Sequence, residues 1–429
     1  MIDAAVTKSR EEKNDMEESI RINSGRLWNS LMEMAKIGQT KIGGVRRLAL
    51  TDIDQQARDL LHQWCNLENL IFRSDAIGNC FYRRQGSDSS LPPLVIGSHL
   101  DSQPTGGKYD GVYGVLAGLE VIRTLNERNI ITKHPIDLVV WTNEEGSRFV
   151  PVMMGSGVFT GAIPLPYALN QTDNNGISVG SALSQLGYNI NNDNIISRDI
   201  FGYLEIHIEQ GPILELSCNI IGIVTGALGQ RWFDVSILGE EAHAGPTPTI
   251  LRRDALLAAA DIVAEVRAIA ENYAPDSRGT VGYLEVFPNS RNVIPGKVKL
   301  SIDFRARDQE TLDAMSLDLR SRCLRDEVSF NVKISLNEVV NFKPQDFNES
   351  LVNEVRASAD KCGYSNQEIV SGAGHDAVYL AGITPAAMIF IPCKDGLSHN
   401  ELESISVDHA EAGCNVLLKT VISSAGGNS

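Results

Sequence analysis

The sequence LVIGSHLDSQPTGGKYDGVYGVLAG, residues 94–118, decides the fold. Its apolar start, 94–96, predicts a buried strand, and the helical spacing of apolar residues over 112–125 predicts a helix. A second apolar run at 136–141 predicts another buried strand. Because strands and helices alternate in this way, we expect an α/β sheet with helices on both faces.

Candidate metal ligands follow both predicted strands. His99 and Asp101 come just after the first strand, and Asp110 stands where the helix should begin. Glu144 and Glu145 come just after the second strand. Ligand sites of open α/β sheets gather at the carboxyl ends of strands, and imidazole and carboxylate groups are common ligands of zinc-like ions. Each residue also has a structural interpretation, as a hydrogen-bonded loop side chain or a helix cap, and both interpretations stay open.

Two further histidines occupy similar positions. His207 lies in YLEIHIEQG, where it points away from the apolar side chains of a predicted strand. His399 lies in GLSHNELE, between a strand predicted at 387–391 and a last helix predicted at 407–423. Three imidazoles with several carboxylates suffice for two metal ions that share a bridging carboxylate, beside which a glutamate can act as general base on water.

The middle of the chain has a different pattern. Its elements follow the order β-α-β-β-α-β, which is the order of a split βαβ or ferredoxin-like unit. We therefore predict an inserted domain at 223–338 and a discontinuous catalytic domain formed by 1–222 and 339–429. The predicted elements of the inserted domain are a strand at 231–238, a helix at 252–271, strands at 278–286 and 296–305, a helix at 308–325 and a strand at 328–337.

Composition excludes several classes of partner. The net charge is −16 and no basic run occurs, whereas a nucleic-acid binder needs a cationic surface. No apolar run reaches the ~18–20 residues of a membrane span. The N-terminal sequence MIDAAVTKSREEKNDMEESIR lacks the apolar stretch that a secretory signal contains. The seven cysteines form no CxxC pair. These features predict a cytoplasmic protein with reduced thiols that acts on a small molecule.

The chain resembles the amidase, hydantoinase and carbamoylase branch of the two-metal aminoacylase and carboxypeptidase superfamily over residues 25–422. The resemblance implies a zinc-peptidase-like catalytic domain with a mixed sheet, interrupted by a ferredoxin-like α+β domain that serves as lid and homodimer interface. It rests on eight motifs in the family's order: GSHLDSQPTGGKYDG, NEEGSRF, HIEQG, EAHAGPTP, RNVIPG, DFRAR, GAGHDA and SHNE.

The resemblance also assigns a metal site for two divalent ions, which could be Zn, Mn, Co or Ni. Asp110 looks like the ligand that bridges both ions. Glu144 looks like the general base, and Asp101 looks like the carboxylate that orients the ring of His99. The metal ligands implied in this way are His99, Asp110, Glu145, His207 and His399.

The same resemblance implies a substrate-binding site. Arg305 looks like the clamp for a substrate carboxylate, which a guanidinium binds through two hydrogen bonds. His243 looks like an oxyanion stabiliser that reaches across a dimer. Gln210, Asn292 and the backbone at Gly374 look like supporting contacts.

The activity implied is hydrolysis of the carbamoyl C–N bond of N-carbamoyl-L-amino acids or N-carbamoyl-β-alanine, which releases ammonia, carbon dioxide and the amino acid. Allantoate amidohydrolase, with the same metals, is the alternative. An aminoacylase or peptidase is less favoured because peptidase relatives commonly place an acid where His207 stands. A non-catalytic binding protein on this scaffold would be expected to lack a ligand or the base.

Overall fold

The computed structural model describes residues 20–188 and 196–427, which form two compact units. Unit 1 takes the described residues up to Gly226 and those from Asp346 onward, and unit 2 runs from Ala227 to Gln345. The expected limits of the inserted domain were 223 and 338. Residues 1–19 of the N-terminal sequence on which the expected location depends lie outside the described residues.

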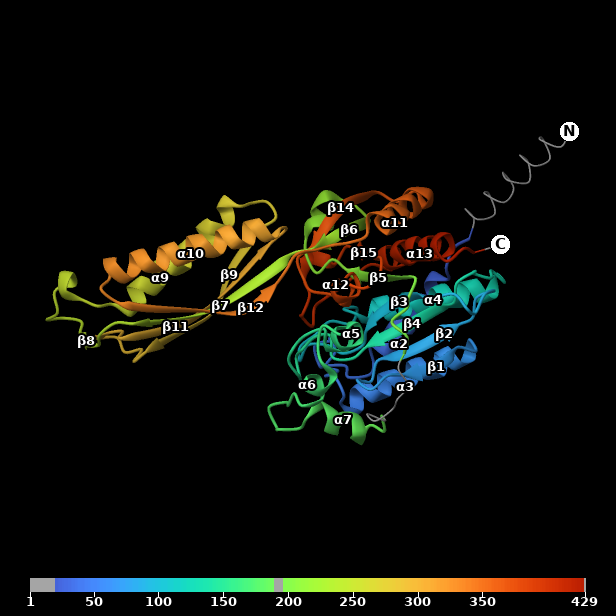
Figure 1. Cartoon of the computed structure of the whole chain (residues 1–429), viewed down its shortest axis with the longest axis horizontal. Coiled ribbons are helices and arrows are strands. Elements are labelled where there is room, and N and C mark those ends of the chain that lie inside the picture. Colours follow the sequence, from blue (N-terminus) through green and yellow to red (C-terminus); the bar gives the residue numbers. More distant parts are fainter. Residues whose placement is uncertain (1–19, 189–195, 428–429) are drawn as a thin grey trace. The chain divides into compact units, whose positions relative to one another are not determined.

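Unit 1 is built on a mixed sheet of nine strands in the order β1-β2-β4-β3-β5-β15-β6-β13, with β14 paired to β6. The central strands β4, β3, β5 and β15 are mutually parallel, whereas β1, β2 and β6 pair antiparallel (Figure 1). The strands are β1 (Ile71–Ser74), β2 (Cys80–Arg84), β3 (Leu94–His99), β4 (Ile136–Trp141), β5 (Gly202–Ile208), β6 (Ile221–Ala227), β13 (Gln345–Asp346), β14 (Asn366–Ser371) and β15 (Ala386–Ile391).

Two groups of helices pack on this sheet. The helices α2, α4, α11 and α13 contact one another, and α5 and α12 form a second group against β4, β5 and β15. The helices of unit 1 are α2 (Ser24–Met34), α3 (Asp52–Leu67), α4 (Val112–Glu127), α5 (Met154–Thr160), α6 (Leu165–Leu169), α7 (Val179–Gln185), α8 (Ile213–Ser217), α11 (Glu349–Cys362), α12 (Asp376–Leu380), the short η2 (Lys394–Gly396) and α13 (Val407–Ser424).

The helix α4 packs against the strands at two of its glycines. A Cβ at Gly114 would stand 2.5 Å from the carbonyl oxygen of Ile206 in β5, and one at Gly118 would stand 2.7 Å from Leu138 in β4. Only glycine avoids these clashes at both positions. The close packing holds the start of α4, just after Asp110, against the edge of the sheet.

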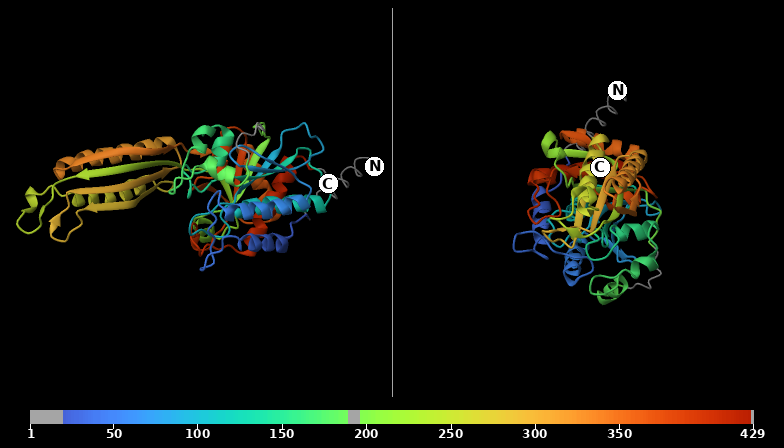
Figure 2. Two further views of the ribbon diagram at one scale, coloured as in Figure 1. Left: turned by 90° about the horizontal axis from the view of Figure 1, so that it is seen from below. Right: turned by 90° about the vertical axis from the view of Figure 1, so that its left-hand side faces the viewer.

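Unit 2 has a four-stranded antiparallel sheet in the order β12-β7-β11-β9, and α9 and α10 pack together on one face of it (Figures 1 and 2). Buried Phe233, Val235 and Ile237 alternate with more exposed residues along β7, so one face of the strand carries the core. The elements are β7 (Gly229–Leu238), β8 (Ala242–His243), η1 (Thr249–Leu251), α9 (Ala255–Asn272), β9 (Arg278–Phe287), β10 (Val293–Ile294), β11 (Lys297–Ala306), α10 (Gln309–Ser329) and β12 (Lys333–Phe342).

Three elements of unit 2, namely α9, α10 and β12, have boundaries that differ from the prediction. The first helix begins at Ala255 rather than 252, because the Asp254 side chain accepts hydrogen bonds from the N–H groups that open the helix. The helix α10 continues to Ser329 instead of ending near 325, since Leu319 and Cys323 keep the helical spacing of buried residues and no glycine or proline interrupts it. The last strand is displaced toward the C-terminus accordingly.

Within the part of the chain that the structure describes, no helix combines the length and the apolar character needed to cross a membrane. All seven cysteines lie in that part, and all are free thiols.

Candidate metal centre

Neighbouring parallel strands of unit 1 bring the expected ligands to one edge of the sheet. The strands β4, β3, β5 and β15 are adjacent in that order, and their carboxyl ends face the same way. Side chains far apart in sequence therefore meet at this edge. They are His99 at the end of β3, Asp110 before α4, Glu145 after β4, His207 near the end of β5 and His399 after β15.

The ligand atoms form two groups that share Asp110. Its Oδ1 lies 3.7 Å from His99 Nε2 and 3.1 Å from His207 Nε2. Its Oδ2 lies 3.4 Å from His399 Nε2, which is 3.2 Å from Glu145 Oε2. Asp110 thus presents one carboxylate oxygen to each group, which is the arrangement that a ligand bridging two ions requires.

The second ring nitrogen of each buried histidine fixes its tautomer. His99 Nδ1 lies 3.0 Å from the main-chain carbonyl oxygen of Asp101, and His207 Nδ1 lies 2.9 Å from that of Ile208. A carbonyl only accepts hydrogen bonds, so a neutral ring carries its proton on Nδ1 and its lone pair on Nε2. The Gly111 N–H group, 3.1 Å from His207 Nε2, fits the same tautomer. In this neutral tautomer, Nε2 is the atom through which each ring would bind a metal, and in His207 the ion would replace the Gly111 N–H group.

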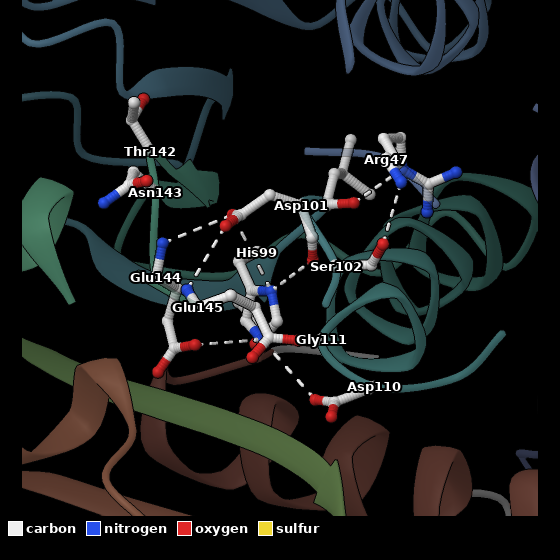
Figure 3. Close-up of polar contacts among 12 residues, drawn as sticks. Arg47, His99, Asp101, Ser102, Asp110, Gly111, Thr142, Asn143, Glu144 and Glu145 are labelled. Atoms are coloured by element: carbon white, nitrogen blue, oxygen red, sulfur yellow. Dashed lines mark hydrogen bonds and ion pairs between the residues drawn. The ribbon is translucent and has the colours of Figure 1, made fainter. Parts of the chain in front are cut away.

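Asp101 connects two loops of the site, as Figure 3 shows. Its carboxylate accepts hydrogen bonds from the N–H groups of Glu144 and Glu145, each at 3.2 Å. The carboxylate comes only to 3.9 Å from the His99 ring, so the main-chain carbonyl of Asp101 makes the orienting contact. Burial raises the pKa of Asp101 to about 6. Asp101 lies beside His99 as expected, but its carboxylate holds the two glutamates in place instead.

Arg47 supports the same loop from the opposite side (Figure 3). This arginine is fully buried, and its Nε donates to the Leu100 carbonyl oxygen at 2.6 Å. The main-chain N–H group of Arg47 donates to Ser102 Oγ at 2.8 Å, and the main-chain N–H group of Ser102 donates to the Arg47 carbonyl oxygen at 2.9 Å. These contacts hold residues 100–102, and with them Asp101, in a fixed position.

The two adjacent glutamates occupy different positions. Glu145, a member of the second ligand group, accepts a hydrogen bond from Gln103 Nε2 at 2.7 Å. Glu144 stands outside both groups, with its Oε2 3.6 Å from His99 Nε2. Burial, followed by the charge of Asp376, raises the pKa of Glu144 well above its ordinary value. A buried glutamate with a raised pKa beside the ligands is suited to accept a proton and return it.

Gln210 and His399 lie in loops with unusual backbone conformations. Gln210 Nε2 donates to Asp110 Oδ2 at 2.9 Å, so this expected substrate contact lies beside the shared carboxylate. The φ angles of Gln210 and His399 are 58° and 52°, which costs a non-glycine residue about 1–2 kcal/mol. The His399 side chain is 51% exposed, whereas the other four expected ligands are buried.

The Asp110 carboxylate keeps its negative charge, and the two histidines bonded to it hold their protons more tightly in return. Burial alone would raise the pKa of Asp110, but hydrogen bonds to His207 and His399 hold it well below its ordinary value. Burial lowers the pKa of His207, yet the bond to Asp110 outweighs it and raises that pKa to about 9. Bonds to Asp110 and Glu145 raise the pKa of His399 to about 10. The two candidate groups offer imidazole nitrogens and carboxylate oxygens but no thiolate, and such ligands bind Zn, Mn, Co or Ni. The residues present therefore fit two divalent ions.

His243 and Asn292, two of the expected substrate contacts, are neighbours in unit 2. His243 in β8 pairs with Val293 in β10, and the Ala244 N–H group donates to the Asn292 carbonyl at 2.9 Å. The Gly245 N–H group donates to His243 Nδ1 at 3.1 Å. A neutral His243 ring then carries its proton on Nε2, as a hydrogen-bond donor to an oxyanion requires.

Arg305 lies at the opposite end of the sheet of unit 2. Its Nε and Nη2 donate to Asp303 Oδ2 at 3.1 and 2.8 Å. Arg305 lies eight residues (305 − 297) along β11 from Lys297, which stands at the end of the strand nearest β10. At about 3.4 Å per residue, this separation is roughly 27 Å. Unit 2 therefore brings His243 and Asn292 together but holds Arg305 apart from both.

Gly374 precedes α12 in unit 1, next to a buried histidine, His375. The His375 ring packs edge-on against the ligand His207 at 4.6 Å between ring centroids, and His375 Nε2 lies 2.9 Å from Ser371 Oγ. Burial, followed by the charge of His207, holds the pKa of His375 well below its ordinary value, so this ring is neutral. The backbone at Gly374 thus lies one residue from a side chain that contacts the candidate centre.

Sequence reasoning missed several residues that hold the ligands. Gln103 Nε2 donates a hydrogen bond to Glu145 Oε2, and Ser398 Oγ lies 3.0 Å from Asp110 Oδ2. Glu403 accepts hydrogen bonds from the main-chain N–H groups just before α4, those of Tyr109 and Asp110. All three stand inside or directly beside the quoted motifs, and that proximity was the signal available. Their partners, up to 294 residues away in sequence, could not be identified from spacing alone.

The chain belongs to the peptidase family M20/M25/M40, whose family model matches residues 95–423. It is 46% identical over 408 residues to an N-carbamoyl-L-amino-acid amidohydrolase of Rhizobium meliloti, a match that covers 95% of this chain and 98% of that protein. It is 35% identical to an allantoate amidohydrolase of Bacillus subtilis, which covers 90% of this chain and 93% of that protein.

Among solved structures, an amidase of the hydantoinase/carbamoylase family from Burkholderia multivorans superimposes with a TM-score of 0.92 at 49% identity, and the match covers 95% of this chain and 99% of that one. The expected family and the mixed α/β fold are thereby confirmed, and the protein is an enzyme of a hydrolase family.

Proposed function

We propose that this enzyme is a two-metal amidohydrolase that cleaves the carbamoyl C–N bond of N-carbamoyl-L-amino acids or N-carbamoyl-β-alanine. The observation that carries the proposal is the pair of ligand groups that share Asp110, with Glu144 beside them but outside both. The similarity to an N-carbamoyl-L-amino-acid amidohydrolase over 95% of the chain supports the choice of substrate class.

Glu144 moves the proton in the proposed reaction. Two divalent ions held by His99, Asp110, Glu145, His207 and His399 would polarise the carbamoyl group and lower the pKa of a water from ~15.7 toward ~7. The Glu144 carboxylate takes the proton of the attacking water. Its raised pKa lets it keep that proton until the C–N bond breaks, when it transfers the proton to the departing nitrogen.

The two main substrate contacts in this proposal, Arg305 and His243, belong to unit 2. Arg305 binds the substrate carboxylate through its guanidinium, with Asp303 orienting the group. His243 donates from Nε2 to the oxygen that gains negative charge, with the tautomer held by Gly245. Asn292, Gln210 and the backbone at Gly374 supply further polar contacts.

These two proposed roles support the proposal of a homodimer. A ureido acid carries its carboxylate and its carbamoyl group only a few bonds apart, whereas roughly 27 Å or more of β-sheet separates Arg305 from His243 within unit 2. One chain therefore cannot supply both contacts to one substrate. We propose that a second copy of the chain supplies His243.

The protein is proposed to act in the cytoplasm. All seven cysteines are free and six are buried, which suits a reducing compartment.

The deciding experiment measures ammonia release by protein that has been stripped with a chelator and reloaded with Zn, Mn, Co or Ni. The panel contains N-carbamoyl-L-amino acids, N-carbamoyl-β-alanine and allantoate. We expect activity on carbamoyl amino acids that the chelator abolishes and metal restores. A large preference for allantoate would instead support the second candidate, which the relative from Bacillus subtilis favours. Absence of chelator-sensitive activity on every compound would indicate a binding protein.

The roles of the adjacent glutamates are separated by two variants. Glu144→Gln should bind both ions but lose turnover by about 10²–10⁴, the usual contribution of general acid–base catalysis. Glu145→Gln should instead weaken metal binding. Equal metal loss in both variants would contradict the assignment of Glu144 as base.

A further inference from the structure

Glu403 is a buried carboxylate that joins two distant loops of unit 1. Its side chain is 3% exposed. The Tyr109 and Asp110 N–H groups donate to Glu403 Oε1 at 3.0 and 3.1 Å. Ser398 Oγ lies 3.0 Å from Glu403 Oε2. One side chain thus contacts both the loop that carries Asp110 and the loop that carries His399.

We infer that Glu403 is a positioning residue for the metal centre: it fixes the Asp110 backbone and the His399 loop relative to each other, so that one carboxylate can serve both ligand groups. The inference rests on the proposed two-metal function. It concerns how the centre is held and assigns Glu403 no contact with substrate or metal.

The backbone just before α4 depends on Glu403 for its hydrogen bonds. Gly111 has a φ of 67°, so the chain enters α4 by a turn, and no side chain caps the helix. Tyr109 and Asp110 are themselves buried, so without Glu403 their N–H groups would lack a hydrogen-bond partner away from water. Glu403 satisfies both groups at once and thereby sets the direction in which the Asp110 side chain leaves the backbone.

Ser398 lies between the carboxylates of Glu403 and Asp110, and its hydroxyl can donate its proton to either of them. Its hydroxyl lies 3.0 Å from Glu403 Oε2 and 3.0 Å from Asp110 Oδ2. Asp110 Oδ2 is the oxygen that faces His399, and Gln210 Nε2 also donates to it at 2.9 Å. The contacts of Glu403 therefore lead to the oxygen that faces the second ligand group.

The glycine at position 107 leaves room for the Glu403 side chain beside the Asp110 loop. A Cβ built at Gly107 would overlap the carboxylate of Glu403. In the same region, a Cβ at Gly44 would stand 2.6 Å from the Cα atom of Glu401. The Gly-Gly turn in the quoted motif thus admits the 401–403 segment beneath the Asp110 loop, a close approach that only glycine permits.

The test compares variants that keep or remove the acceptor atoms. Glu403→Met keeps most of the side-chain volume but removes every acceptor, whereas Glu403→Gln retains a carbonyl oxygen for the two N–H groups. Gly107→Ala displaces the carboxylate without changing it. Glu401→Met, in the same loop, is the matched control. Metal affinity is measured by chelator competition with Co²⁺, and the melting temperature of the metal-free protein is recorded separately.

We expect metal affinity to fall about 10–100-fold in Glu403→Met and in Gly107→Ala, the usual effect of losing a residue that orients ligands. Both ions should weaken together because Asp110 is shared. Glu403→Gln should retain nearly full affinity, and Glu401→Met should be unchanged. In Glu403→Met, kcat at saturating metal should fall more than KM rises, because no substrate contact is removed.

Three results would overturn the inference. The first is unchanged metal affinity in both Glu403→Met and Gly107→Ala. The second is a lower melting temperature with unchanged metal affinity, which indicates a structural role only. The third is equal loss in Glu403→Gln and Glu403→Met, which indicates a role of charge rather than position. If Glu403→Met does not fold, Gly107→Ala and Glu403→Gln still decide the question. Failure of the proposed function is distinguishable, since wild-type protein would then bind metal but release no ammonia.

Discussion

Replacing Asp101 by asparagine tests whether its carboxylate holds the glutamate loop. The side chain is 1% exposed, and each carboxylate oxygen accepts one N–H group at 3.2 Å, from Glu144 and from Glu145. In Asp101→Asn one of these N–H groups must face an NH₂ group, so one hydrogen bond is lost. A hydrogen bond to a charged group contributes about 1.5–3 kcal/mol, which corresponds to about 10–150-fold in an equilibrium constant.

The loss of this hydrogen bond can lower either the free energy of unfolding of the metal-free protein or the free energy of metal binding. If the glutamate loop keeps its position, the folded metal-free protein loses stability. If the loop moves to relieve the clash, Glu145 leaves its position and metal affinity falls. The two losses should therefore sum to about 1.5–3 kcal/mol, however they are divided.

The assay measures both quantities on the same protein. Chemical denaturation of the metal-free form gives the loss of unfolding free energy, and chelator competition gives the loss of binding free energy. Asp59→Asn, on the exposed side of α3, is the control for removal of one carboxylate charge. A summed effect of Asp101→Asn within about 0.5 kcal/mol, the range of neutral surface substitutions, would refute the reasoning.

Three further predictions concern other parts of the enzyme. Arg305→Lys loses the forked guanidinium, so KM for carbamoyl amino acids should rise about 10–100-fold with little change in kcat; an unchanged KM in initial-rate assays would contradict its role as clamp. The pKa values of His207 and His399 are about 9 and about 10, so both rings carry protons at neutral pH without metal. Ion binding should therefore release protons, and metal affinity should rise with pH up to about 10. Titration calorimetry in two buffers of different ionisation enthalpy tests this, and equal heats would argue against it. Gly111→Ala should abolish metal binding, because a Cβ there would overlap the His99 ring; tight binding of two ions by this variant, followed by metal analysis, would show the prediction to be wrong.

Much of the catalytic sheet could be predicted because its signals are local. The apolar runs of β3, β4 and β15 form fully buried strands, and the residues that follow them meet at one edge because parallel strands end together. Placing candidate ligands at strand ends therefore identified residues that the structure brings together. The helix caps, such as Asp254 before α9, shifted the predicted ends by a few residues only.

The support of the ligands could not be predicted in the same way. Whether Asp101 contacts His99 through its carboxylate or its carbonyl depends on a rotation about the side chain, which spacing does not determine. The contact between Glu403 and the Asp110 loop joins residues 293 positions apart. Such contacts depend on the register of the whole sheet, and they appear only once the fold is known.

The order of the strands has a consequence for how the enzyme is made. In the sheet, β15 lies between β5 and β6, yet ribosomes add it only after all of unit 2. Until β15 leaves the ribosome, the edges of β5 and β6 lack their central partner, and such unpaired edges promote aggregation. Unit 2, a contiguous stretch, can complete its fold during this interval. Because His399 follows β15, the nascent chain acquires the last of the proposed metal ligands only after unit 2 has been made, so binding of the proposed ions would follow the synthesis of unit 2.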